Sequence, residues 1–168
     1  MIILSEDVHI RLMQKKDLQR LAEIYVKVYT VFDVGERWTV KQARKLCSYW
    51  LKRQPDLAFV AVIEGEVVGA FISSIISWND GNRLADGELF VHPDYQKKGV
   101  GTRLCITLYK KALEKYDVTF FDAATFKNRE FPLQWYLSQG FEVHKEWTLI
   151  SGDVKKILST LEAKARKS

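Results

Sequence analysis

Leu89-Phe90-Val91-His92-Pro93-Asp94-Tyr95-Gln96-Lys97-Lys98-Gly99-Val100-Gly101-Thr102 joins the end of an apolar strand to the start of a helix. The first amides of a helix have no intrahelical partner, and the helix dipole adds partial positive charge, so a helix start favours an anion. Glycine at 99 and 101 leaves the backbone open to phosphate oxygens, and Lys97 and Lys98 add positive charge. We therefore predict a bound pyrophosphate at Gln96–Thr102.

Two common nucleotide-binding motifs do not fit this loop. The Walker motif needs a Lys-Ser/Thr pair after its second glycine, where this chain has Thr102-Arg103. The dinucleotide fingerprint needs a third glycine at the position of Leu104. The phosphate ligand is therefore expected to belong to another class of cofactor.

On either side of the loop, the pattern of apolar and polar residues predicts a series of strands and helices. Strands are expected at 8–12, 57–63, 67–78, 83–91 and 118–124, with one or two more at 141–150. Helices are expected at 18–29, 39–53, 99–116, 132–140 and 153–165. The strand–helix–strand unit at 83–124 implies a parallel strand pair in an otherwise antiparallel sheet. The expected fold is a mixed α/β (α+β) domain with helices on both faces of one sheet.

Composition places the chain among ordinary globular proteins. Its 168 residues are 47% hydrophobic and 28% charged, which fits a single domain over 1–168. No apolar run reaches membrane-spanning length, and Cys47 and Cys105 give neither a metal spacing nor a disulfide framework. We expect a cytoplasmic protein that contacts no membrane. Its net charge of +5 is dispersed, so we expect no nucleic-acid partner either.

At this point the sequence resembles a known superfamily. Gln96-Lys97-Lys98-Gly99-Val100-Gly101 matches the Gln/Arg-x-x-Gly-x-Gly/Ala signature of the GNAT superfamily of N-acetyltransferases, and Val91-x-Pro93-Asp94-Tyr95 also resembles that family. So does the downstream run Trp135-Tyr136-Leu137-Ser138-Gln139-Gly140-Phe141. The resemblance implies a cofactor-binding core at 83–141 and a splayed pair of neighbouring strands.

The resemblance also implies acetyl-CoA as the cofactor. Backbone groups of Leu89, Phe90 and Val91 would pair with its pantetheine arm as an added strand would. Its pyrophosphate would be bound by Gln96, Lys97, Lys98, Gly99, Val100, Gly101 and Thr102. Asn128 resembles an asparagine that holds the cofactor arm in relatives, although it stands one residue further from Tyr136 than is usual.

Transfer of an acetyl group to an amine needs a base and an acid. The resemblance places the acid at the tyrosine of the Tyr-x-x-x-Gly-Phe motif, here Tyr136. Asp86 and Glu88 lie two residues apart on a strand, so both are expected to project from one face. Relatives often keep an acid at or next to Glu88, which makes Glu88 the first candidate for the base and Asp86 the second.

The acceptor pocket of such enzymes is usually shaped by the loop between the first two helices. Here the loop carries Phe32, Asp33, Glu36 and Trp38, and Trp78 is a further candidate. Aromatic rings with carboxylates suit a small cationic amine. The Trp38-Thr39 opening and the strand at 86–91 are similar to the aminoglycoside 6′-N-acetyltransferase-like branch.

Two other functions remain open at this point. The chain is expected to be an N-acetyltransferase acting by direct transfer, but its acceptor could be a protein N-terminus or a lysine. It could also be a non-catalytic acyl-CoA-binding sensor. Many relatives form dimers, so a homodimer is a possible assembly.

Overall fold

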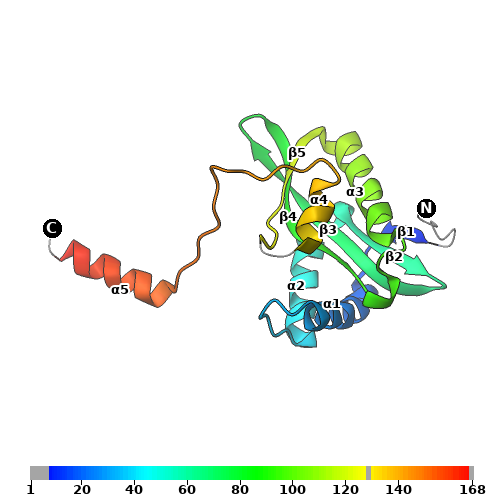
Figure 1. Ribbon diagram of the computed structural model, residues 1–168, viewed down its shortest axis with the longest axis horizontal. Coiled ribbons are helices and arrows are strands. Elements are labelled where there is room, and N and C mark those ends of the chain that lie inside the picture. The colour runs from blue at the N-terminus through cyan, green and yellow to red at the C-terminus, as the bar shows by residue number, and fades with distance from the viewer. Residues whose placement is uncertain (1–7, 128–129, 167–168) are drawn as a thin grey trace. The chain divides into compact units, whose positions relative to one another are not determined.

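The computed structural model describes residues 8–127 and 130–166 (Figure 1). They fall into two compact units, over residues 1–124 and 125–168. The first unit carries strands and helices in the order β1 (His9–Leu12), α1 (Leu18–Phe32), α2 (Val40–Arg53), β2 (Ala58–Ile63), β3 (Glu66–Trp78), β4 (Gly81–Val91), α3 (Val100–Tyr116) and β5 (Val118–Asp122). Short 3₁₀ turns lie at η1 (Lys15–Asp17), η2 (Pro55–Leu57) and η3 (Pro93–Tyr95).

The five strands form one mixed sheet in the order β1-β2-β3-β4-β5. The first three pairings are antiparallel, and β4 pairs with β5 in parallel. A hairpin can join antiparallel neighbours, whereas parallel neighbours need a crossover, and α3 supplies it. The parallel pair predicted from residues 83–124 is confirmed.

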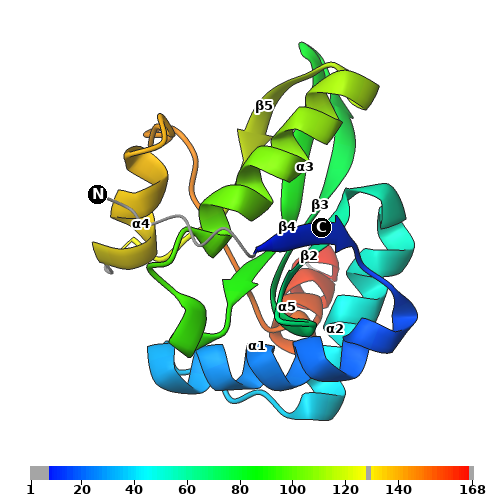
Figure 2. The ribbon, with the colours of Figure 1, turned by 90° about the vertical axis from the view of Figure 1, so that its right-hand side faces the viewer.

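Helices cover both faces of the sheet (Figure 2). On one face α1 and α2 bury apolar side chains against the strands, in a cluster that includes Leu21, Cys47 and Ile72. On the other face, the ring of Phe71 lies 5.9 Å from that of Tyr109 in α3 and 6.0 Å from that of Phe121 in β5. The expected mixed α/β fold is therefore present.

The second unit carries α4 (Glu130–Leu137) and α5 (Val154–Ala165). Phe131 departs from helical geometry, so the regular turns of α4 begin at Pro132, as predicted. The chain leaves α4 through Gly140, whose φ of 96° lies in the left-handed region that favours glycine.

The expectation of strands at 141–150 is wrong. Among the described residues this segment forms no strand, although its apolar and polar residues partly alternate. Alternation predicts a strand only where a second strand supplies hydrogen bonds and one face is buried. Here the side chains of Trp147, Leu149 and Ile150 are exposed.

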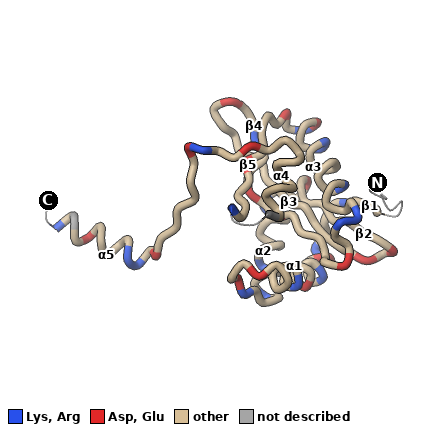
Figure 3. Tube along the Cα trace, in the orientation of Figure 1, with Lys and Arg blue, Asp and Glu red and all other residues tan. Residues whose placement is uncertain are grey.

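Charged side chains of both signs are mixed over the first unit (Figure 3). Within the described residues, no helix combines the length and the apolar character that crossing a membrane requires.

Candidate functional site

The loop between β4 and α3 takes the conformation predicted from its glycines. Gly99 is the N-cap of α3, with φ of 79° in the left-handed region, and Lys97 is also left-handed, with φ of 60°. The amide of Arg103 donates to the carbonyl of Gly99 at 3.0 Å, which closes the first helical turn. The amides of Val100, Gly101 and Thr102 precede it, so α3 offers them no carbonyl partner.

The side chains of this loop leave it accessible. Lys97 and Lys98 are exposed, and Lys98 Nζ lies 5.4 Å from the centre of the Tyr95 ring. Gln96 fastens the loop to the strand before it, because its side-chain amide donates to the carbonyl of Val91 at 2.9 Å. The loop combines helix-start amides with two cations and is held at the end of β4. This chemistry suits an anion.

Beside the loop, one edge of β4 lacks a strand partner. Leu89, Phe90 and Val91 pair with β3 on one side. The parallel pairing with β5 ends at Ala85 and Asp122, so within the described residues β5 does not reach the last six positions of β4. Apart from the Val91 carbonyl, which accepts from Gln96, backbone groups on that side are therefore available to an extended ligand.

A β-bulge interrupts β4 just before this open edge. Asp86 and Gly87 both have positive φ, 55° and 111°, and the register with β3 shifts there. Ser73 Oγ donates to the carbonyl of Asp86 at 3.1 Å. A Cβ on Gly87 would lie 1.9 Å from the carbonyl oxygen of Ile72, so only glycine fits this position.

The bulge decides which carboxylate faces the helices. Glu88 pairs with Ile72 and Ala85 pairs with Ser74, so three steps along β4 match two along β3. Glu88 thus shares a side with Ile72, beneath α1 and α2. The expectation that Asp86 and Glu88 project from one face is wrong, because the inserted residue breaks the two-residue alternation. Asp86 is exposed and Glu88 is half-buried.

The surroundings of Glu88 make it harder to ionise. Burial raises the pKa of its carboxyl to about 7, a hydrogen bond from Tyr25 lowers it, and the charge of Glu36 raises it. Glu88 in turn acts on its neighbours: burial first and its charge second raise the pKa of Tyr25, Tyr29 and Cys47. A carboxyl group that titrates near neutrality can accept and release a proton under physiological conditions.

Aromatic rings pack around this carboxylate. Tyr25 stacks on Tyr29, with centroids 4.6 Å apart, and meets both Trp38 and Phe90 edge-on at 5.1 Å. From their spacing in the sequence, both tyrosines were expected only in the apolar stripe of the helix at 18–29. The missed signal is that two hydroxyl-bearing residues, one turn apart, lie on the face that turns toward the sheet.

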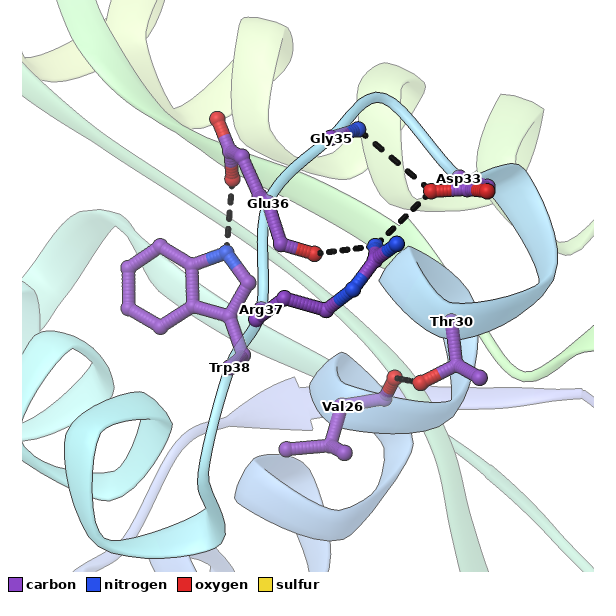
Figure 4. A network of polar contacts seen from close by, with 7 residues as sticks. All are labelled: Val26, Thr30, Asp33, Gly35, Glu36, Arg37 and Trp38. Atoms are coloured by element: carbon purple, nitrogen blue, oxygen red, sulfur yellow. Dashed lines mark hydrogen bonds and ion pairs between the residues drawn. The ribbon is translucent and has the colours of Figure 1, made fainter.

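The loop between α1 and α2 forms a polar hollow of about 320 Å³, lined by Thr30, Asp33, Glu36, Arg37 and Trp38. Figure 4 shows its contacts: Trp38 Nε1 donates to Glu36 Oε2 at 2.6 Å, and Arg37 Nη1 donates to Asp33 Oδ1 at 2.8 Å. Three predicted acceptor residues, Asp33, Glu36 and Trp38, thus come together.

Two predicted acceptor residues do not line this hollow. Phe32 is the last residue of α1 and is half-buried. Trp78 pairs with Gly81 at the β3–β4 hairpin, and the Arg83 guanidinium lies 6.0 Å from the centre of the Trp78 ring. Glu88 pairs with Ile72, six residues before Trp78 on β3, so the two positions are about 20 Å apart along the strand.

Comparison with known families agrees with this arrangement. The model of the acetyltransferase (GNAT) family matches residues 18–141, which is most of the chain. The chain belongs to the GNAT family of acetyltransferases. This match includes the helix-start loop, the bulged strand, the acidic hollow and α4.

Named relatives support the same assignment. An uncharacterized N-acetyltransferase of Methanocaldococcus jannaschii is 34% identical over 109 residues, which cover 62% of this chain and 46% of the relative. Another uncharacterized N-acetyltransferase, from Archaeoglobus fulgidus, is 30% identical over 110 residues, 63% of this chain and 74% of the relative. The match with the first relative spans less than half of that protein's length.

Solved structures share the GNAT fold. A possible acetyltransferase from Clostridium difficile superimposes with a TM-score of 0.70 at 15% identity, covering 89% of this chain and 99% of its own. A ribosomal-protein-alanine N-acetyltransferase from Brucella melitensis gives 0.66 at 19%, covering 87% and 99%. An aminoglycoside acetyltransferase from a soil metagenome, in complex with sisomicin, gives 0.62 at 16%, covering 90% and 99%.

The GNAT motif at the end of α4 is well formed within the second unit. The Tyr136 ring lies 5.1 Å from the ring of Trp135 and 5.1 Å from that of Phe141. The amide of Phe141 donates back to the carbonyl of Tyr136 at 3.3 Å, across Gly140. Asn128, the predicted contact to the cofactor arm, lies outside the described residues.

Proposed function

We propose that the protein transfers an acetyl group directly from acetyl-CoA to a primary amine of a small cationic acceptor. One observation carries the proposal: Glu88, a half-buried carboxyl whose pKa burial raises to about 7, lies on β4, the strand that leads to the helix start at Gly99. A thioester of coenzyme A supplies the activated acetyl group.

The cofactor fits the residues that are present. Amides at the start of α3, with Lys97 and Lys98, would bind its pyrophosphate, and Gln96 would keep the loop against β4. The unpaired edge at Leu89–Val91 would hold an extended amide chain by backbone hydrogen bonds. With Asn128, which lies outside the described residues, these are the cofactor-binding residues predicted from the sequence.

We propose Glu88 alone as the base. An aliphatic ammonium has a pKa of about 10, so it must lose a proton before its nitrogen can attack. A carboxylate with a pKa near the working pH is a suitable acceptor for that proton, directly or through water. Asp86 is exposed and falls within the bulge, so we assign it no step.

Tyr136 is the proposed acid. Its phenol has a reference pKa about 1.5 units above that of a thiol, so a hydrogen bond that strengthens as charge develops on sulfur is easier than full proton transfer. The proposal rests on the Tyr136–Gly140–Phe141 motif and its observed turn.

The acceptor side suits positive charge. Asp33, Glu36 and Arg37 line the hollow with Trp38, and because Arg37 pairs with Asp33, Glu36 is the carboxylate that the proposal assigns to a cation. Tyr25 and Tyr29 continue the aromatic wall from Trp38. Aromatic faces and carboxylates both attract ammonium groups. An aminoglycoside acetyltransferase shares the fold, which agrees with a small amine as the first candidate. A ribosomal-protein-alanine N-acetyltransferase also shares the fold, which makes a peptide amine the second candidate. We place the reaction in the cytoplasm, where the buried free thiols of Cys47 and Cys105 stay reduced.

Release of the coenzyme A thiol in the presence of different amines tests the proposal. We expect acetyl-CoA with a diamine or an aminoglycoside to release thiol, and a peptide with a free N-terminus to release much less. In the same assay, Tyr136→Phe should slow turnover by roughly a hundredfold. Release with the peptide alone would support the protein acceptor, whereas binding of acetyl-CoA without release by any amine would indicate a sensor.

A further inference from the structure

His92 is a buried polar residue at the entry to the cofactor loop, Gln96–Thr102. It follows the last residue of β4 and is only 7% exposed. Its amide donates to the carbonyl of Val68 on β3 at 2.8 Å, and its ring meets that of Tyr95 edge-on, with centroids 5.7 Å apart. The imidazole is therefore fixed between the sheet and η3.

Two hydrogen-bond donors face the two nitrogens of this imidazole. The Asp94 amide donates to Nδ1 at 3.3 Å, so the His92 side chain caps η3. Lys27 Nζ, on α1, lies 3.2 Å from Nε2. A neutral imidazole has a free lone pair on one nitrogen only, so it can accept from one of these donors but not from both.

The mobility of the two donors decides which of them the lone pair serves. The Asp94 amide belongs to the backbone of η3, whereas the Lys27 side chain is half-exposed and also lies 3.9 Å from Asp94 Oδ2. The ammonium can turn toward that carboxylate on its flexible stem, but the amide cannot turn away without opening η3. The lone pair is therefore on Nδ1 and the proton on Nε2. A doubly protonated ring would have no lone pair for the amide.

We infer that His92 is a positioning residue for the cofactor loop: its neutral imidazole caps η3, and protonation of the ring releases the cap and weakens the binding of acetyl-CoA. The inference rests on the proposed function in taking Gln96–Thr102 as the loop that binds the cofactor. The cap itself is a property of the folded protein without cofactor.

Contacts of η3 lead from this cap to the loop. The Gln96 amide donates to the carbonyl of Pro93 at 3.2 Å, and Lys98 Nζ lies 5.4 Å from the centre of the Tyr95 ring. The residues of η3 thus set the positions of Gln96 and Lys98. Loss of the cap loosens η3, so Lys98 and the amides at the start of α3 are held less well for a pyrophosphate.

The groups around the imidazole favour its neutral form near pH 7. Burial and the charge of Lys27 lower the pKa of His92, the carboxylate of Asp94 raises it, and the charge of Arg20 on α1 lowers it. Asp94 Oδ2 lies 3.7 Å from Nδ1, so a protonated ring would turn from the Asp94 amide to its carboxylate. Because the pKa of His92 lies below its ordinary value of 6.5, the cap is present at pH 7 and is lost as the pH falls through that pKa.

Nitrogen-15 NMR of the histidine rings tests the cap without any ligand. The His92 signals are assigned from their loss in His92→Asn. At pH 7.5 we expect the ring shifts of the neutral tautomer that carries its proton on Nε2. Lys27→Gln should raise the midpoint of the His92 titration, because it removes a cation beside Nε2. Lys52→Gln is the control, because it removes the same charge at an exposed position of α2.

Calorimetric titration with acetyl-CoA tests the positioning role, at pH 7.5 and at one unit below the measured midpoint of His92. His92→Leu, which has no acceptor for the cap, should bind about fivefold more weakly than the wild type at pH 7.5. His92→Asn supplies an amide oxygen, a favoured cap that does not titrate, and should stay within about twofold. At the lower pH, His92→Asn should bind more tightly than the wild type. Comparison at equal pH removes the titration of the cofactor's own phosphates from the result.

Weaker binding by His92→Leu, with a smaller loss of affinity on acidification in His92→Asn than in the wild type, supports the inference. A neutral wild-type ring with its proton on Nδ1 would overturn it. Equal binding by His92→Leu and the wild type at pH 7.5, or the same dependence on pH in the wild type and His92→Asn, would overturn it as well. If the wild type binds no acetyl-CoA, the proposed function fails and the positioning role with it, while the tautomer still decides whether His92 caps η3.

Discussion

At the scale of the residue, Glu88 makes the fold depend on pH. Its pKa rises from an ordinary value of 4.5 to about 7 on folding, mainly through burial. A carboxyl group whose pKa is higher in the folded state binds more protons there than in the unfolded state. The Glu88 carboxyl therefore contributes most to the free energy of unfolding below pH 4.5, and its contribution is lost as the pH rises to about 7.

Glu88→Gln should therefore stabilise the protein at pH 8 more than at pH 5. At pH 8 the wild-type protein carries the cost of ionising a half-buried group, at most about 3 kcal/mol for this change of pKa. At pH 5 the folded wild-type carboxyl is mostly neutral and resembles the amide. Urea unfolding at the two pH values measures the difference. A gain of equal size at both would show that Glu88 titrates normally.

At the scale of the element, the bulge in β4 sets the position of Glu88. The strand predicted at 83–91, between a turn and Pro93, is confirmed as part of β4. The two-residue spacing of Asp86 and Glu88 did not predict which carboxylate points to the helices, since one inserted residue breaks the alternation of the strand. Gly87 inside a strand was the available signal. At residues 141–150 strands were predicted but are absent, because no described strand pairs with this segment.

Gly87→Ala should destabilise the protein severely. The new Cβ would lie 1.9 Å from the Ile72 carbonyl oxygen, and φ of 111° is strained for alanine. Gly65→Ala is the matched control, because Gly65 also has positive φ, at 82°, but no heavy atom lies within 4 Å of its added Cβ. We expect a loss of about 1 kcal/mol at Gly65 and several at Gly87, measured by urea unfolding. Similar losses would show that the bulge is not held tightly by β3.

At the scale of the whole molecule, the order of elements along the chain predicted the sheet topology, whereas the side-chain contacts of the site could not be predicted from it. The strand–helix–strand unit fixed a parallel pair, and the glycines at 99 and 101 fixed the start of α3, because both rest on local chain geometry. The cluster of Tyr25, Glu88 and Trp38 brings together three separate segments. No residue spacing along the chain predicts this cluster, because its contacts form only when α1 packs on the sheet.

The proposed function depends most on the binding of acetyl-CoA at the start of α3. Isothermal titration calorimetry of the protein with acetyl-CoA measures this directly. We expect saturable one-to-one binding by the wild type, loss of binding in Gly101→Asp, and retained binding in Lys110→Ala. The last variant changes the net charge by the same single unit at an exposed position further along α3. Absence of binding by the wild type, or undiminished binding by Gly101→Asp, would contradict the account.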